Sequence, residues 1–164
     1  MQIHIMLSRL LPKDKVNFLG VFARDLIPSL NTINYPACFV ANTDPSTKPG
    51  SHWVAFYLKS KHEVEFFDSY GFHSRLYGFS IPIDSYNHTQ YKSFNSTVCG
   101  HFCMLYLYTR IHCSCPLEKH FSKTNFKWNE SKLIKWIRSV KLTKKHDTPC
   151  SSNICIQSCK CRNH

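Results

Sequence analysis

Cys99 stands where a nucleophile could act. The residues before it, Asn95 to Thr97, are good helix N-caps, and apolar residues recur at helical spacing from Cys99 to Arg110, which predicts a buried helix that begins at Cys99. A cysteine in the first turn of a helix lies at the positive end of the helix dipole, which lowers its pKa and favours the thiolate. Because the thiolate is the attacking species, this position permits nucleophilic catalysis.

A histidine and a carboxylate are predicted to meet on a hairpin. The segments His52 to Leu58 and Glu63 to Asp68 are predicted strands, joined by a short polar turn. A turn centred near Ser60 places His52 directly opposite Asp68, where their Cβ atoms would be about 4.5–5.5 Å apart. A register slip of one residue would separate the two side chains. Between Asp68 and a thiol, His52 could act as general base and general acid.

Structural roles for these residues stay open at this level. Buried thiols on helix faces usually only pack, and a histidine beside a tryptophan is often a hydrogen-bonded structural residue. Trp53 has two interpretations, as a packing residue or as a wall of a substrate cleft. Cys103, one turn after Cys99, and Cys38 are predicted to be small core residues.

The remaining segments outline the framework around these residues. Pro36 to Thr43 is a predicted buried strand, and a turn rich in Pro and Gly, Asp44 to Ser51, leads from it into the hairpin. No regular element is predicted from after Gly71 to about Lys92. A second helix is expected from Asn129 to Val140, with Asn129 as its cap and an apolar stripe that packs on the core.

The composition predicts one folded domain. The chain has 164 residues, of which 43% are hydrophobic and 19% are charged, far from the composition of disordered chains. It holds no apolar run long enough to span a bilayer, and its N-terminus lacks the features of a secretory leader. Nine cysteines, an odd number, do not suggest a complete disulfide framework. We therefore expect a reduced intracellular setting, the nucleus or the cytoplasm.

Basic residues gather towards the C-terminus. The chain has 21 Lys and Arg against 10 Asp and Glu, and residues 111–164 hold 11 of the basic and 3 of the acidic side chains. This excess could bind nucleic acid, although solubility alone would also explain it. We expect a domain at 1–140 and a basic, poorly ordered tail at 141–164. Four tail cysteines could ligate Zn²⁺, but they lack paired C-x2-C spacing, so no metal site is predicted. They are Cys150, Cys155, Cys159 and Cys161.

Three sequence blocks together resemble one known family. The blocks GSHWVAFYL, FFDSYGF and NSTVCGHFCMLYL are similar to the conserved motifs of the adenain-like cysteine proteases, the group of the adenovirus protease and its relatives in viruses and large DNA transposons. This group is allied to the proteases of ubiquitin-like proteins. The resemblance covers about residues 17 to 110, and the chain order of histidine, acid and cysteine is the same.

The resemblance implies a fold and a set of roles. The fold would be α+β, with a small antiparallel sheet packed against the helix of the nucleophile. Cys99 would be the nucleophile, His52 the general base and acid, and Asp68 the residue that orients His52. The oxyanion would be held by the backbone N–H of Cys99 and by a side chain upstream. The family has Gln seven residues before the nucleophile, where this chain has Lys92, so Lys92 and the nearby Gln90 are the candidates.

The leading hypothesis is a cysteine endopeptidase that works through a thioester intermediate. By resemblance it would process proteins of a virus or mobile element, in the cell or in virions, and be stimulated by a peptide cofactor and by DNA. It needs no cofactor for its chemistry. Two alternatives stay open: an isopeptidase that removes a ubiquitin-like protein, and an inactive protease scaffold that binds nucleic acid through its basic C-terminal third.

Overall fold

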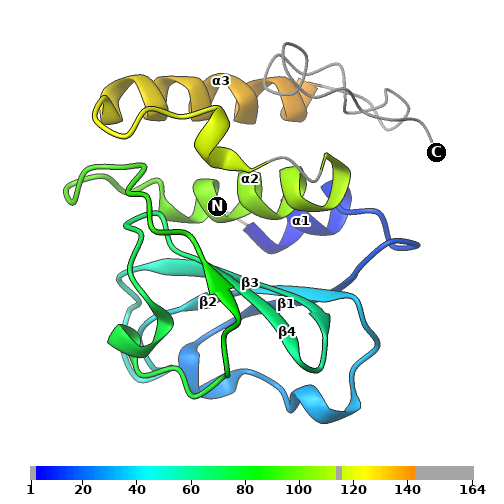
Figure 1. The fold of residues 1–164 in the computed structure, drawn as a ribbon. Helices are drawn as coiled ribbons and strands as arrows, with labels where there is room; N and C mark the ends of the chain where they lie inside the picture. Colours follow the sequence, from blue (N-terminus) through cyan, green and yellow to red (C-terminus); the bar gives the residue numbers. More distant parts are fainter. Residues whose placement is uncertain (1–2, 114–115, 143–164) are drawn as a thin grey trace.

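Five strands form one mixed sheet in the order β1-β2-β3-β4-β5. The computed structural model describes residues 3–113 and 116–142, and Figure 1 shows these as an α+β fold. The strands are β1 (Asn17–Phe22), β2 (Ala37–Asn42), β3 (Trp53–Ser60), β4 (Glu63–Phe67) and β5 (Ser85–Tyr86). The helices are α1 (Ile3–Leu10), α2 (Cys99–His112) and α3 (Phe126–Leu142).

The expected antiparallel sheet is correct only at its centre. The strands β2, β3 and β4 are antiparallel, whereas β1 pairs with β2 and β4 pairs with β5 in parallel. The reason lies in the connections at the two edges. Residues 23–36 and 68–84 are long crossovers that return the chain to the end of the sheet from which it came, and a crossover joins parallel strands.

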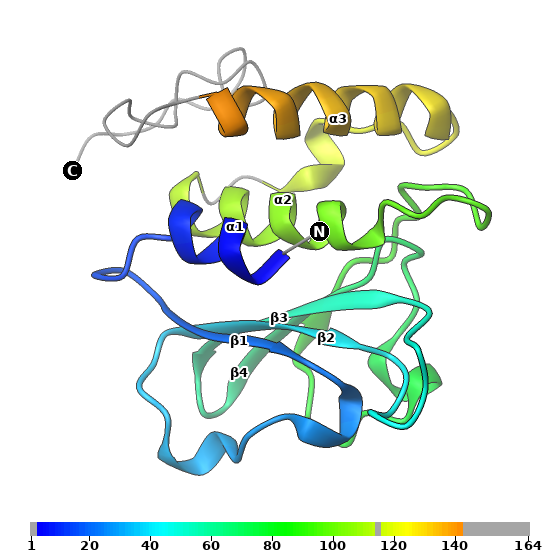
Figure 2. The ribbon, with the colours of Figure 1, turned by 180° about the vertical axis from the view of Figure 1, so that it is seen from behind.

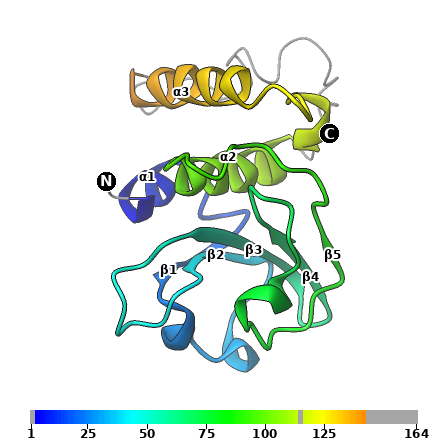
Figure 3. The same ribbon diagram turned by 90° about the vertical axis from the view of Figure 1, so that its left-hand side faces the viewer.

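Helices cover one face of the sheet, and loops cover the other. The helices α1 and α2 lie on the sheet, and α3 lies on the far side of α2 (Figures 1 and 3). Short 3-10 turns and connecting loops close the opposite face (Figure 2). All six residues of β2 are buried, because side chains on both of its faces are covered: Cys38 and Val40 pack under the helices, and Phe39 and Ala41 pack under the loops. The predicted buried strand is confirmed.

The helix of Cys99 is the central helix of the domain. The sequence predicts it from Cys99 to Arg110, and in the structure it extends to His112. Most of its residues are buried, because the sheet lies on one side of it and α3 on the other. The expected caps are wrong. The N-cap residue is Val98, and no side chain caps this helix in the described structure, so its first amides are left for other partners.

The helix α3 begins three residues earlier than expected. Its first turn is capped by Asn125, whose Oδ1 accepts a hydrogen bond from the backbone N–H of Trp128 at 3.0 Å. The expected cap, Asn129, is instead completely buried. Its amide group donates to the carbonyls of Tyr91 (2.9 Å) and Ser122 (2.8 Å), and its oxygen accepts from the Ser122 N–H (2.8 Å). Asn129 therefore ties α3 to the loop that precedes Cys99.

The expected domain boundary at 140 lies close to the end of α3 at Leu142. The tail residues 143–164, with Cys150, Cys155, Cys159 and Cys161, lie outside the described residues, and the expectations about them stay predictions. Among the helices that the structure describes, none is long and apolar enough to cross a membrane.

Asn129→Ala should destabilise the domain by about 3 kcal/mol, because it leaves one buried and two partly buried backbone groups without their partner. Asn125→Ala removes only an exposed cap and should cost about 1 kcal/mol. Urea unfolding followed by circular dichroism measures both free energies. Equal losses in the two variants would contradict the role of Asn129 as an internal tether.

Candidate active site

The hairpin of β3 and β4 is two residues out of the expected register. Ala55 pairs with Phe67, where the expected register would pair it with Glu65. The turn lies at Lys61 and His62, later than expected, so that Ser60 pairs with Glu63. An irregularity between Leu58 and Ser60 takes back one residue of this shift and leaves two. Because side chains alternate with a period of two, a shift of two residues keeps the same residues on the same face. The expected pairing is wrong, but the shared face survives.

His52 and Asp68 consequently meet along a diagonal. His52 lies just before β3 and Asp68 just after β4, and continuing the observed register places Tyr70, not Asp68, opposite His52. The rings of His52 and Tyr70 stack with centroids 4.5 Å apart. The Nε2 atom of His52 is 2.6 Å from Oδ1 of Asp68. The structure thus joins the predicted histidine and acid.

The carboxylate of Asp68 is fully buried and surrounded by donors. Besides His52 it accepts hydrogen bonds from the backbone N–H of Tyr70 at 2.9 Å and of Phe72 at 3.2 Å. The hydroxyl of Tyr77 donates to it at 2.7 Å. Four donors on one buried carboxylate fix its position and compensate its lost hydration.

A glycine turn directs these backbone donors at Asp68. Gly71 has φ +78°, and a Cβ atom there would lie 2.9 Å from the carbonyl carbon of Thr89. Its N–H donates to the Asp68 carbonyl at 2.8 Å. A residue with a side chain would be strained here and would clash with backbone. Gly71 therefore explains the spacing of the FFDSYGF block.

Cys99 completes the line of three side chains. It is the first residue of α2 and is 5% exposed, and His52 is 6% exposed. Its thiol interacts with His52, and each of these two groups shifts the pKa of the other. Since Nε2 of the imidazole is occupied by Asp68, the other ring nitrogen, Nδ1, is the one left for sulfur. The order Asp68, His52, Cys99 is that of a catalytic triad.

The environments of Cys99 and His52 favour an ion pair. Burial raises the pKa of the Cys99 thiol, but the hydrogen bond from His52, the backbone N–H of Trp53 and the charges of His52 and Lys92 lower it below the ordinary 9.0. Burial lowers the pKa of His52, but its bonds to Asp68 and Cys99 prevail and raise the pKa above 6.5. Both shifts favour thiolate and imidazolium at neutral pH.

Lys92 and Gln90 are placed very differently. Lys92 is 1% exposed, and its ammonium donates to the Tyr70 hydroxyl (2.6 Å), the Ser96 carbonyl (2.9 Å) and the Ser93 carbonyl (3.3 Å). An ammonium has three N–H groups, so these acceptors use all of them. Lys92 therefore acts on Cys99 by its charge. The amide of Gln90 donates to the Lys92 carbonyl at 2.8 Å and holds this loop.

Trp53 contributes through its backbone. Its N–H favours the thiolate of Cys99 and thereby lowers the pKa of that thiol, and its carbonyl accepts from the Cys103 thiol at 3.3 Å. The side chain is partly buried and packs on the core, close to Gly100. Cys38 and Cys103 are completely buried, so both predictions of core residues are confirmed.

Sequence reasoning missed Tyr70, Tyr77 and Asn87. Tyr70 contacts both His52 and Lys92, and Tyr77 donates to Asp68. Asn87 holds the backbone of Asp68 from both sides, by accepting from its N–H at 2.8 Å and donating to its carbonyl at 2.6 Å. Tyr77 ends a short 3-10 turn (Ser74–Tyr77), and Asn87 directly follows the two-residue strand β5, so no periodic pattern in the sequence marks their contacts.

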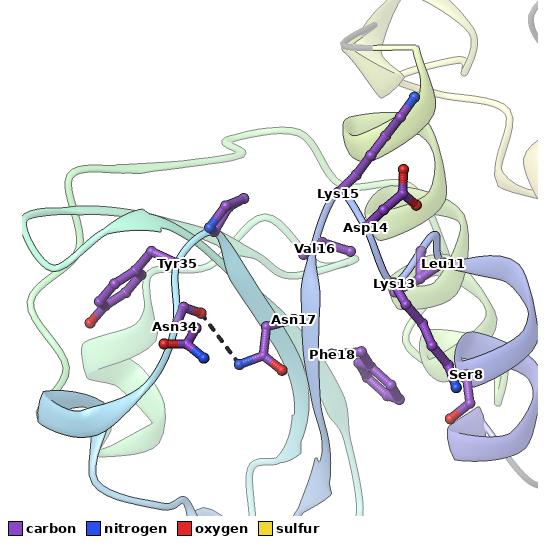
Figure 4. Close-up of a pocket in the computed structure, with 11 residues that line it drawn as sticks. Ser8, Leu11, Lys13, Asp14, Lys15, Val16, Asn17, Phe18, Asn34 and Tyr35 are labelled. Carbon is purple, nitrogen blue, oxygen red and sulfur yellow. Dashed lines mark hydrogen bonds between the residues drawn. The ribbon is translucent and has the colours of Figure 1, made fainter.

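Another cavity lies at the other end of the sheet. It has a volume of about 500 Å³ and lies between α1, the following loop and the starts of β1 and β2 (Figure 4). Lys13, Asp14 and Lys15 line it, and Asn17 donates to the Asn34 carbonyl at 3.3 Å across it. Its lining among the described residues holds no cysteine or histidine, so it offers no Cys–His pair.

Comparison of the chain with models of known protein families finds no match, and comparison with curated proteins also finds none. Within the ranges 3–113 and 116–142, no group of His, Cys, Asp and Glu side chains could hold a metal ion. We therefore infer the chemistry of the site from the arrangement of its own residues.

Cys99 should react with iodoacetamide at pH 6–7, well below its ordinary pKa. His52→Ala should slow this labelling by at least about tenfold, because it removes a hydrogen bond and a charge and leaves the burial that raises the pKa. Mass spectrometry of labelled peptides measures the rates against pH. Cys38, whose pKa burial raises to about 12, and Cys103 are internal controls that should stay unlabelled. Equal rates with and without His52 would contradict the ion pair.

Lys92→Met should slow Cys99 labelling several-fold at pH 6–7, because it removes a buried positive charge that lowers the Cys99 pKa. The curve of rate against pH should move to higher pH and keep its plateau. Gln90→Met, which removes a hydrogen bond but no charge, is the control and should leave the curve in place. A thermal melt of each variant separates this effect from unfolding, and an unmoved curve in folded Lys92→Met would refute it.

Proposed function

We propose that this chain is a cysteine endopeptidase of the adenain-like kind. The observation that carries the proposal is the buried pair of Asp68 and His52, joined through Nε2 of His52, together with the interaction of this imidazole with the Cys99 thiol. The order of the three residues along the chain, and the block of residues around each, support the adenain-like assignment. A histidine with a purely structural role does not require a cysteine at a helix N-terminus beside it, whereas a histidine that acts as general base and acid does.

The first half of the reaction forms an acyl-enzyme. The Cys99 thiolate attacks the carbonyl carbon of the scissile bond, which forms a C–S bond and a tetrahedral oxyanion. The His52 imidazolium then gives its proton to the amide nitrogen, the C–N bond breaks, and the amine leaves. Asp68 keeps His52 in the orientation and tautomer that this transfer needs.

The second half is hydrolysis of the thioester. His52, now neutral, takes a proton from a water molecule, whose oxygen attacks the acyl carbon. Collapse of this second intermediate breaks the C–S bond, releases the acid and restores the thiolate with the imidazolium. Activity should fall at low pH, where Cys99 is protonated, and at high pH, where His52 is not.

The oxyanion would be stabilised by backbone groups and by one fixed charge. The uncapped N-terminus of α2 offers the amide of Cys99 to a negative oxygen. The N–H groups of the Lys92 ammonium are all engaged, so Lys92 would stabilise the oxyanion through its positive charge and not through a hydrogen bond. This differs from the Gln that the family places seven residues before the nucleophile. Gln90 remains the other candidate, with one of its amide protons engaged.

The natural substrates and partners are carried by the resemblance alone. Proteins of a virus or mobile element are the proposed substrates, and DNA and a short peptide are the proposed activators. The basic C-terminal third would bind DNA by a salt-sensitive electrostatic interaction.

The test is cleavage of an unfolded protein, such as reduced casein, by the full chain and by Cys99→Ala. The parent should produce new peptides, and Cys99→Ala should lower the rate by at least about 1000-fold. Leu26→Ser, an exposed change away from the triad, should cut like the parent. Cleavage of a ubiquitin-like C-terminal reporter without cleavage of casein would select the isopeptidase. Equal activity in Cys99→Ala would refute catalysis at this site.

A further inference from the structure

A groove of about 420 Å³ lies beside His52, and the catalytic steps above do not use it. Its apolar wall is formed by Tyr70, Phe72, Leu76 and Phe94. Thr43 and Asp44 lie at its polar end, together with Arg24, whose guanidinium is bound by the Tyr77 carbonyl. The groove thus has a broad apolar wall next to the imidazole.

The apolar wall is unusually exposed. The large hydrophobic side chains that the described structure exposes number seven, and three of them line this one groove: Phe72 is 39% exposed, Leu76 is 66% and Phe94 is 63%. Exposed apolar surface that gathers at one place, and not singly, marks a binding site. An apolar ligand that binds in the groove would bury this wall and remove its apolar surface from water, which favours binding.

The wall is held in place before any ligand arrives. The rings of Tyr70 and Phe94 stack with centroids 4.9 Å apart, and those of Phe72 and Phe94 stack at 6.3 Å. The Tyr70 hydroxyl donates to the Phe94 carbonyl at 3.2 Å. Tyr70 is itself fixed by its contacts with His52 and Lys92. A preformed surface of this kind loses little freedom on binding.

The position of the groove indicates which part of a peptide it faces. His52 lines it, and among the described residues Cys99 does not. In the proposed reaction the acyl part of the substrate is bonded to the Cys99 sulfur, whereas the amine part receives its proton from His52. A groove that begins at the imidazole therefore lies on the side of the leaving amine.

We propose that this groove binds a large apolar side chain, aromatic or leucine-like, from the first two residues on the leaving-group side of the scissile bond. The inference rests on the proposed protease function and names its substrate class. The volume suits one or two side chains. Bound there, the side chain would hold the leaving amine against His52 and would be covered by Phe72, Leu76 and Phe94.

The experiment is a cleavage profile on a library of peptides from a digested proteome, read by mass spectrometry. The full chain should cut with a preference of at least about fivefold for Phe, Tyr, Leu or Met within two residues after the cut, relative to Gly or Ser. Leu76→Ser and Phe94→Ser should lose most of this preference, measured as the ratio of kcat/KM for peptides with an apolar residue there to kcat/KM for peptides with Gly there. Leu26→Ser, 60% exposed and outside the groove, is the matched control and should keep the parent's preference.

The outcomes separate this inference from the proposed function. Cleavage that depends on Cys99 but shows no apolar preference after the cut would overturn the groove inference alone. The groove inference also fails if the preference is unchanged in Leu76→Ser and Phe94→Ser, or if these variants change only the preference before the cut. The absence of any Cys99-dependent cleavage would overturn the proposed function and the groove's role with it.

Discussion

The buried carboxylate of Asp68 is the constraint on which the rest of the site depends. A charge without water must be met by donors, or it costs several kcal/mol. Here the chain supplies His52, Tyr77 and two backbone N–H groups from the turn around Gly71. These four donors come from three segments, so compensation of one charge orders the end of the hairpin and the loop after it.

This ordering passes from Asp68 to the nucleophile. The carboxylate fixes the imidazole of His52, and the imidazole stacks on Tyr70. Tyr70 in turn accepts a hydrogen bond from Lys92, which binds the carbonyls of Ser93 and Ser96 just before α2. The start of α2, and with it Cys99, is thus tied to the acid by a continuous set of contacts. Burial raises the pKa of Cys99, but the interactions with His52, Trp53 and Lys92 lower it and prevail.

The outer layers support the same loop from behind. Asn129 on α3 binds the Tyr91 carbonyl, one residue before Lys92, and Gln90 binds the Lys92 carbonyl. Asn87 holds the backbone of Asp68. The loop from β5 to α2 has no regular secondary structure, but side-chain hydrogen bonds hold it in place at several points. A site that is built on a loop needs such hydrogen bonds to hold its side chains in position.

The sequence by itself determined the central elements and singled out His52, Asp68 and Cys99 as the residues of the candidate site. The strand at β2, the hairpin and the two main helices follow from periods of two and of 3.6 residues, which are local properties. It also indicated His52 and Asp68 as partners, because the two-residue error in register preserved the face. Only the tertiary structure decided the true register, the caps at Val98 and Asn125, and the parallel edges of the sheet. The roles of Lys92, Tyr70, Tyr77 and Asn87 were decided there too, because hydrogen bonds between segments far apart in the chain leave no repeating pattern in the sequence.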